Sequence, residues 1–198
     1  MNHHILTRGS LGLGFVIAFL AVLSTEAMAT TTSCTAPSPL EQPFLYAGDS
    51  NYYAPLPGES FDNVSGTGWT LSSGAKLVTT TLSDGKTGSV LDLPSGSKAV
   101  SPELCVTNEY PSARTLVRNA VGSQSVTVQM AYYGASSWGS TKNVGNVTGS
   151  GSAWTLSGAL KLPVGNLVGW NVTRFTFVPS GKSSESQIYN FYVDPRMH

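Results

Sequence analysis

Short runs of strand-forming residues, separated at close intervals by Gly, Ser, Pro and Asp, fill the sequence after residue 68. Turn clusters such as Ser-Asp-Gly-Lys at 83–86 and Pro-Ser-Gly-Lys at 179–182 recur too often to leave room for long helices. Many short strands joined by such turns are typical of sandwiches and barrels, so we predict an all-β fold. The predicted strands cover 69–71, 75–81, 89–93, 98–100, 113–119, 125–133, 142–147, 154–162, 174–179 and 187–193.

Alternation of apolar and polar residues assigns one face of several predicted strands to the core. In 125–133 every second residue is apolar, and in 174–179 two phenylalanines oppose Arg174 and Thr176. One apolar face and one half-polar face per strand is what two packed antiparallel sheets require, which predicts a two-sheet antiparallel β-sandwich. The side chains expected to be buried together are Val126, Val128, Met130, Phe175, Phe177, Phe191 and Val193.

The last predicted strand, 187–193, follows the same rule with a period of two residues. Strict alternation places Tyr189 on the core side together with Phe191 and Val193. The opposite, half-polar side then carries Ile188, Asn190 and Tyr192.

The first 29 residues have the three parts of a secretory signal peptide. Arg8 supplies the positive charge, 11–23 is an apolar run, and Ala27 and Ala29 form the small-x-small cleavage pattern. The apolar run is too short to cross a bilayer, which takes about 20 residues. We therefore expect cleavage after Ala29, a secreted extracellular protein, and no membrane partner after the signal is removed. The expected parts are a signal peptide at 1–29, a Pro/Ser/Thr-rich extended lead-in at 30–56, and a β-sandwich domain at 57–198.

Cys34 and Cys105 are the two cysteines of the chain. An even count in an exported protein predicts a disulfide, which would tie the lead-in to the domain. The alternative is a pair of free thiols with a redox role, and the Cys-x-x-Cys spacing typical of that role is missing.

The charged residues are balanced, with 11 basic and 11 acidic side chains and a formal net charge of zero. The basic residues form neither a stripe nor a block. This pattern argues against nucleic acid as a partner and against a polybasic membrane-binding patch.

Three short motifs carry a resemblance to a known class of proteins: Pro-Gly-Glu-Ser-Phe-Asp at 57–62, Gly-Trp-Thr-Leu at 68–71, and Ile-Tyr-Asn-Phe-Tyr-Val-Asp-Pro at 188–195. Together they resemble the frame of carbohydrate-binding modules with the galactose-binding-like jelly roll. The segment 89–106 resembles secreted bacterial β-sandwich proteins of the same general shape. The resemblance implies a jelly-roll sandwich and a carbohydrate ligand.

Modules of that class often hold a structural calcium through an acidic pair on the last strand, where this chain has Tyr189 and Asn190. Asp62 and Asn190 are the oxygen donors left for such a site. Calcium takes six to eight oxygens, so the alternative is that Asp62 is an ordinary turn residue. No other cofactor is expected.

The sequence offers little for catalysis. His198 is the one histidine after the signal peptide, so a Ser-His-Asp arrangement and a histidine-liganded zinc site both lack their residues. Paired carboxylates remain as an alternative, and Asp92 and Glu103 are the acids in a strand-like context. We expect a non-enzyme, with a polysaccharide hydrolase or lyase as the alternative.

The four tryptophans divide into two groups. Trp69, Trp154 and Trp170 stand at strand starts and are expected to be structural. Trp138 lies in a Gly/Ser loop next to Tyr133, where an aromatic face suits stacking on a sugar ring. The alternative is that Trp138 folds back over the end of the sandwich.

The half-polar strand faces supply further candidates, which we expect to line one sheet together with Tyr133. The alternative is a solvated sheet surface without a ligand. The sequence thus predicts a non-catalytic domain that binds an extracellular polysaccharide, with a structural or adhesive protein as the main alternative. The predicted binding residues are Trp138, Tyr133, Gln129, Arg118, Arg174 and Tyr192, and Asn190 is expected on the same sheet.

Overall fold

The computed structural model of this 198-residue chain describes residues 34–58, 61, 68–109, 111–164 and 168–195. The predicted signal peptide and Asp62 lie outside these residues. Within them the one helical element is η1, a 3-10 turn at Leu45–Ala47. The described part contains no helix long and apolar enough to cross a bilayer.

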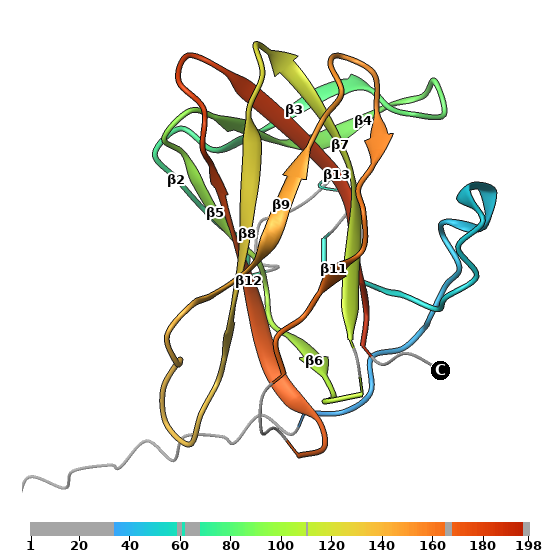
Figure 1. The fold of residues 1–198 in the computed structure, drawn as a ribbon, viewed down its shortest axis with the longest axis vertical. Helices are drawn as coiled ribbons and strands as arrows, with labels where there is room; N and C mark the ends of the chain where they lie inside the picture. The colour runs from blue at the N-terminus through green and yellow to red at the C-terminus, as the bar shows by residue number, and fades with distance from the viewer. Residues whose placement is uncertain (1–33, 59–60, 62–67, 110, 165–167, 196–198) are drawn as a thin grey trace, which may run out of the picture. The chain divides into compact units, whose positions relative to one another are not determined.

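Two antiparallel sheets lie face to face, as the sequence predicted (Figure 1). The first is a seven-stranded sheet with the order β10-β7-β13-β4-β3, in which β1 also pairs with β13 and β11 with β7. Its strands are β1 (Ala54–Pro55), β3 (Lys76–Thr81), β4 (Thr87–Pro94), β7 (Ser112–Val121), β10 (Thr155–Leu156), β11 (Leu160–Lys161) and β13 (Glu185–Asp194).

The second is a six-stranded sheet with the order β2-β5-β12-β8-β9, in which β6 also pairs with β12. The central pair β12 and β8 runs in continuous register from Thr173↔Tyr132 to Pro179↔Val126. Its strands are β2 (Thr70–Ser72), β5 (Lys98–Val100), β6 (Leu104–Val106), β8 (Ser125–Tyr132), β9 (Lys142–Thr148) and β12 (Asn171–Pro179).

The core between the sheets contains the residues that alternation predicted. Phe191 of the seven-stranded sheet packs against Phe175 and Phe177 of the six-stranded sheet, with ring centroids 5.1 and 5.0 Å apart. Trp69 stacks on Phe177 and packs against this core, which confirms its structural role. All seven side chains predicted to be buried together belong to this core: Val126, Val128, Met130, Phe175, Phe177, Phe191 and Val193.

The prediction that Tyr189 faces the core is wrong, because β13 contains a β-bulge. The register of β13 with β7 shifts between Tyr189 and Tyr192, and Asn190 has a positive φ of 54°. One extra residue resets the alternation, so Ile188 is fully buried in the core while Tyr189 is half-buried outside it, near Trp154.

The observed strands also differ from the predicted ones in three places. The single strand expected at 154–162 is two short strands. Between them the Ser157 amide donates to the Thr115 carbonyl, while the Ser157 hydroxyl, in place of its carbonyl, accepts from the Thr115 amide. The strands β1 and β6 were not predicted. With two and three residues, they are too short to show a period.

The lead-in is tied down covalently and by packing. Cys34 and Cys105 form the predicted disulfide, with their Cα atoms 5.6 Å apart. Further along, Phe44 and Tyr53 are buried with Tyr192 of β13 in a small aromatic cluster separate from the main core. The lead-in therefore covers part of the outer face of the seven-stranded sheet.

Candidate functional site

The loop between β8 and β9 holds Trp138 in a defined position. Tyr133 and Trp138 form an isolated antiparallel bridge, and their rings meet edge to face with centroids 5.3 Å apart. The amide of Gly134 donates to the carbonyl of Ser137 at 2.8 Å, which closes a tight turn. This small hairpin projects a pair of aromatic rings from the edge of the six-stranded sheet.

Arg174 of β12 lies directly beside this aromatic pair. Its guanidinium carbon sits 4.1 Å from the centroid of the Trp138 ring, a cation–π geometry. The next residue, Phe175, is fully buried in the core, and its amide donates to the Ser101 hydroxyl at 2.9 Å. Alternation along β12 thus fixes the Arg174 backbone and turns its side chain outward, where it is half-buried.

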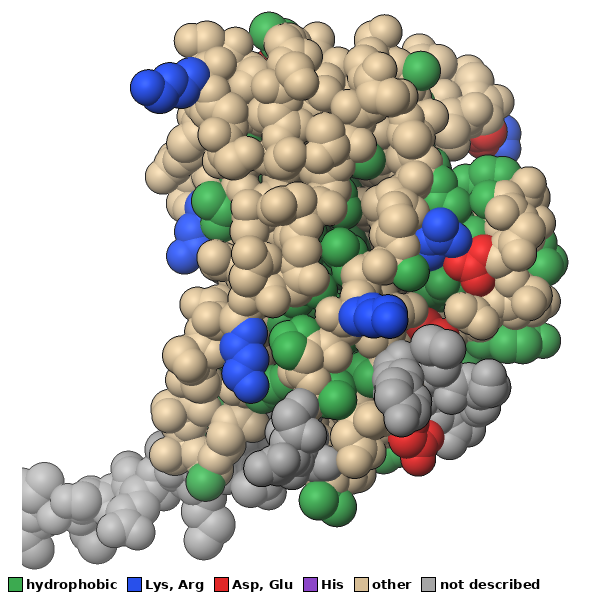
Figure 2. All heavy atoms as spheres, in the orientation of Figure 1, with side chains coloured by type: hydrophobic (Ala, Val, Ile, Leu, Met, Phe, Trp, Pro, Cys, Tyr) green, Lys and Arg blue, Asp and Glu red, His purple; other side chains and the backbone are tan. Residues whose placement is uncertain are grey.

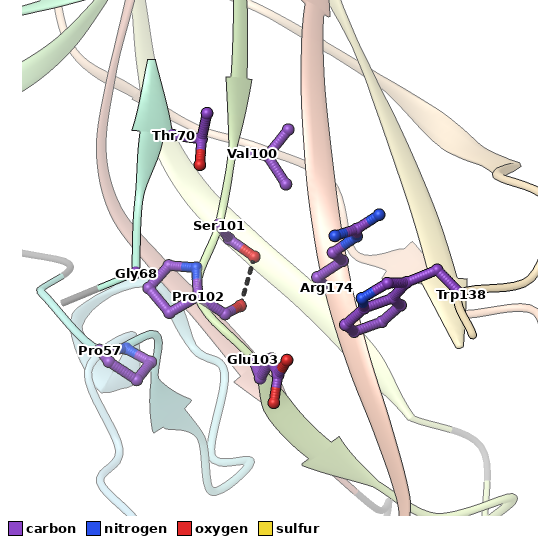
Figure 3. A pocket seen from close by; sticks show the side chains of 9 residues that line it. All are labelled: Pro57, Gly68, Thr70, Val100, Ser101, Pro102, Glu103, Trp138 and Arg174. Atoms are coloured by element: carbon purple, nitrogen blue, oxygen red, sulfur yellow. Dashed lines mark hydrogen bonds between the residues drawn. The ribbon is translucent and has the colours of Figure 1, made fainter. Parts of the chain in front are cut away.

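Arg174 and Trp138 form one wall of a cleft of about 410 Å³ (Figure 3). Glu103 is exposed at this cleft, and no described residue forms an ion pair or hydrogen bond with the Arg174 guanidinium. The cleft therefore offers free donors from an arginine, acceptors from a carboxylate, and an aromatic ring. Its lining residues are Pro57, Gly68, Thr70, Val100, Ser101, Pro102, Glu103, Trp138 and Arg174.

A second hollow is lined by other residues of the same hairpin. Its volume is about 630 Å³, and Tyr133, 40% exposed, lies in its lining with Lys142 and Asn171. Tyr132 also lines it. The Tyr132 hydroxyl is buried without a hydrogen-bond partner among the described residues, and burial raises the pKa of Tyr132 to about 12. The aromatic pair thus contributes one ring to each opening, Trp138 to the cleft and Tyr133 to the hollow.

Gln129 lies on the same outer sheet face as Arg174. It pairs in register with Thr176 of β12 and Asn143 of β9, while Arg174 pairs with Ala131, two residues further along β8. Four of the predicted binding residues, Trp138, Tyr133, Arg174 and Gln129, therefore belong to one sheet and its edge hairpin.

The prediction that Arg118 and Tyr192 line this same sheet is wrong, because both belong to the seven-stranded sheet. Arg118 on β7 donates to Gln187 at 2.9 Å and to Thr80 at 2.5 Å, and lies over the Trp154 ring at 4.8 Å. Tyr192 on β13 is buried against Phe44. Alternation assigns a residue to one face of a strand, but it does not say to which sheet that strand belongs.

Asn190 also belongs to the seven-stranded sheet, at the bulge of β13. Asp62, its expected partner in a calcium site, lies outside the described residues. Among the residues that are described, no group of three or more His, Cys, Asp or Glu side chains gathers as a metal site would require. A structural calcium held by Asp62 and Asn190 stays an untested prediction.

The two acids singled out from the sequence do not form a pair. Asp92 of β4 is fully buried in the seven-stranded sheet, where it accepts a hydrogen bond from Gln187 at 3.0 Å. Lys76 lies 3.6 Å from its second oxygen. Glu103 stands at the cleft of the six-stranded sheet. The carboxylate that Asp92 does meet is Glu185, and their interaction, with burial, raises the pKa of Glu185.

Sequence reasoning missed most of the wall opposite Trp138. Thr70, Val100 and Ser101 reach the cleft because β2 and β5 stack beside β12 in register, with Thr70↔Val100 and Val100↔Thr176. Nothing in the local sequence signals this pairing between distant segments. Glu103 was noted as an acid near a strand, but its position beside Trp138 depends on the same pairing.

No protein-family model and no curated protein matches this chain. Solved structures do. The CBM22-1–GH10 modules of endo-1,4-β-D-xylanase 10B from Clostridium thermocellum, complexed with xylohexaose, are 14% identical with a TM-score of 0.54, over 73% of this chain and 29% of that chain. An arabinose-bound α-L-arabinofuranosidase, MgGH51, is 17% identical with a TM-score of 0.50, over 74% of this chain and 27% of that chain.

A separate module gives a match of similar extent. The CBM22-1 xylan-binding domain of Paenibacillus barcinonensis Xyn10C is 12% identical with a TM-score of 0.48, over 70% of this chain and 93% of that domain. The chain thus spans less than a third of the two longer enzyme chains and most of the length of the single module. The described part of the chain has the two-sheet jelly-roll fold of carbohydrate-binding modules.

Proposed function

We propose that this protein is secreted and binds an extracellular polysaccharide, without cleaving it, in the cleft beside Trp138. Secretion is inferred from the signal pattern at 1–29 and from the Cys34–Cys105 disulfide. N-terminal sequencing of the exported protein should begin at Thr30.

The observation that carries the proposal is Arg174. A half-buried guanidinium that stacks on an indole and has no polar partner among the described residues keeps its fork of donors available for a ligand. Sugar hydroxyls both donate and accept hydrogen bonds. A neutral sugar ring can therefore accept from Arg174 and donate to Glu103 while its apolar face rests on an aromatic ring.

The arrangement also indicates which aromatic ring meets the ligand. Arg174 covers one face of Trp138, and the Tyr133 ring meets the indole edge to face, so part of the indole is already occupied. Tyr133 is the more exposed of the two rings. A polysaccharide chain that crosses the hairpin would contact Tyr133 and Trp138 in succession and have room in the hollows on either side.

The proposal is tested by titrating the protein with a panel of soluble polysaccharides in affinity gels, followed by calorimetry. Xylan comes first, because the matched CBM22-1–GH10 modules are complexed with xylohexaose, and β-1,4-galactan is included as a second neutral polysaccharide. Trp138→Ala should weaken binding by about 1–3 kcal/mol through lost stacking and area. Arg174→Ala should weaken it through lost hydrogen bonds to the sugar.

A matched control is Lys98→Ala, which removes an exposed cation from β5 of the same sheet without altering the cleft lining. It should bind like the wild type. If well-folded protein retains no polysaccharide of the panel, the proposal is wrong, and a structural or adhesive role becomes the better explanation. Release of reducing sugars or unsaturated products from a bound polysaccharide would contradict the non-catalytic part.

A further inference from the structure

A second cleft lies outside the seven-stranded sheet, on the opposite layer of the sandwich from Arg174. Its volume is about 340 Å³, within the range of small-ligand pockets. Four segments that are distant in sequence build it: η1, the turn between β3 and β4, strand β7, and the stretch from Trp154 into β10. The lining residues are Tyr46, Ser83, Asp84, Leu116, Trp154 and Leu156.

The η1 wall of this cleft is firmly anchored. Phe44, just before η1, is buried under Tyr53 and Tyr192. Asp49, just after it, accepts hydrogen bonds from Arg114 at 2.5 Å and from the Tyr53 hydroxyl at 2.7 Å. Although η1 is anchored at both ends, the Tyr46 side chain on it is 71% exposed. Hydrophobic side chains gather at the right edge of Figure 2, where Figure 1 draws η1.

The Trp154 wall is held just as closely. The indole Nε1 donates to the carbonyl of Thr81 at 2.9 Å, which joins this loop to the end of β3. Arg118 lies over the ring at 4.8 Å, and the Tyr189 ring is 6.0 Å away. The Trp154 ring is therefore set in place before any ligand arrives, which lowers the entropy lost on binding.

The polar side of the cleft is the turn that carries Ser83 and Asp84. The Asp84 carboxylate accepts from the Lys86 amide at 3.0 Å and lies 3.3 Å from the Lys86 ammonium. The hydrogen bond from the Lys86 amide contributes most to a lowered pKa of Asp84, so the carboxylate stays ionised and retains acceptor capacity. An ionised acid beside two aromatic rings suits hydroxyl donors.

We propose that the Tyr46–Trp154 cleft is a second carbohydrate site, which takes a neutral sugar unit through ring stacking and through hydroxyl donation to Asp84. This second site is supported by its own lining residues and does not depend on the Arg174 cleft. The consequence that one molecule then holds two polysaccharide segments, one on each side of the sandwich, rests on the function proposed above for the Arg174 cleft.

The test follows each tryptophan separately by NMR. The indole N–H signals of Trp138 and Trp154 are assigned with Trp138→Phe and Trp154→Phe variants, and the protein is titrated with xylohexaose and β-1,4-galactotriose to about 10 mM. The expected result is a saturable shift of the Trp154 signal by at least one sugar. Tyr46→Ala should weaken that binding about tenfold, as should Asp84→Asn.

Tyr52→Ala is the matched control, because Tyr52 is a 48% exposed tyrosine of the same lead-in that does not line the cleft. It should leave the Trp154 titration unchanged, as should Arg174→Ala. The second site is overturned if neither sugar shifts Trp154, or if Tyr46→Ala and Tyr52→Ala bind alike. A shift of the Trp138 signal without a shift of the Trp154 signal would support the proposed function and reject the second site. A shift of the Trp154 signal alone would support the second site and reject binding at the Arg174 cleft.

Discussion

On the outer face of the seven-stranded sheet, Arg114 and Arg118 each hold two polar partners, whereas Arg174 outside the six-stranded sheet holds none among the described residues. Arg114 donates to Asp49 and to the Ser157 carbonyl, and Arg118 donates to Gln187 and Thr80. All three arginines also lie near an aromatic ring. The number of polar partners therefore distinguishes Arg114 and Arg118, which hold the fold together, from Arg174, whose donors remain available for a ligand.

The largest expected effect concerns the covalent attachment of the lead-in to the sandwich. The disulfide joins residues 71 apart in sequence, and a closed loop of that length stabilises the fold by roughly 4 kcal/mol in the chain-entropy model. The double variant Cys34→Ser/Cys105→Ser should lose about 2–5 kcal/mol in urea unfolding. Reduced wild-type protein is the control and should lose a similar amount. A loss near zero in both would show that the lead-in is held by packing alone.

The next prediction tests the arginine comparison directly. Arg114→Ala leaves the Asp49 carboxylate, 12% exposed, without its ion-pair partner, and should lower the free energy of unfolding by about 3 kcal/mol. Arg174→Ala removes a contact with one ring and should lower it by at most about 1 kcal/mol. Chemical denaturation of the two variants side by side measures both values. Equal losses would mean that Arg174 is as structural as Arg114.

A pH dependence should arise from the seven-stranded sheet. The interaction with Asp92 and burial raise the pKa of Glu185 above its ordinary value of 4.5. From pH 4.5 upward the folded state therefore holds more protons than the unfolded state, and stability falls as the pH rises through the folded pKa. Glu185→Gln keeps a donor toward Asp92 and should flatten this decline in urea unfolding between pH 4.5 and about pH 7. A variant with the same slope as the wild type would place the titrating group elsewhere.

The smallest effect is expected on the outer face of the six-stranded sheet. Thr127 of β8 donates its hydroxyl to the exposed Asn146 side chain at 2.9 Å. Thr127→Val keeps a β-branched residue in the strand and should change the free energy of unfolding by less than about 0.5 kcal/mol. Thermal unfolding is sensitive enough to check this. A larger loss would show that polar pairs on this face also support the fold.

Where strands are long and regular, the sequence was sufficient to predict which side chains face the core and which face outward. In β8 and β12 the alternation of Val128, Phe175 and Phe177 with polar residues predicted both burial and the outward position of Arg174. It failed at Asn190, because a bulge inserts a residue without leaving a periodic signal. The register shift of β13 with β7 and the positive φ of Asn190 show where the alternation resets.

The candidate site was predictable only in part. Trp138 and Tyr133 are neighbours through a short loop, so local sequence brings them together. Arg174 joins them through the long-range pairing of β12 with β8, and Glu103 through that of β5 with β12. Arg118 fits the same local pattern as Arg174, yet it lies in the other sheet. Strand order, which local periodicity does not encode, places Arg174 at the cleft and Arg118 in the other sheet.

The disulfide also determines how the domain would carry a mechanical load. Cys105 lies on β6, which pairs with β12 in the six-stranded sheet. Tension applied to the chain ahead of Cys34 and to the end of β13 passes across the sulfur–sulfur bond and then along the chain from Cys105. The residues from 35 to 104 lie inside the covalent loop and bear no direct pull. Tyr46 and Asp84 therefore lie off the covalent path of the load, whereas Trp154, β12 and Arg174 lie on it.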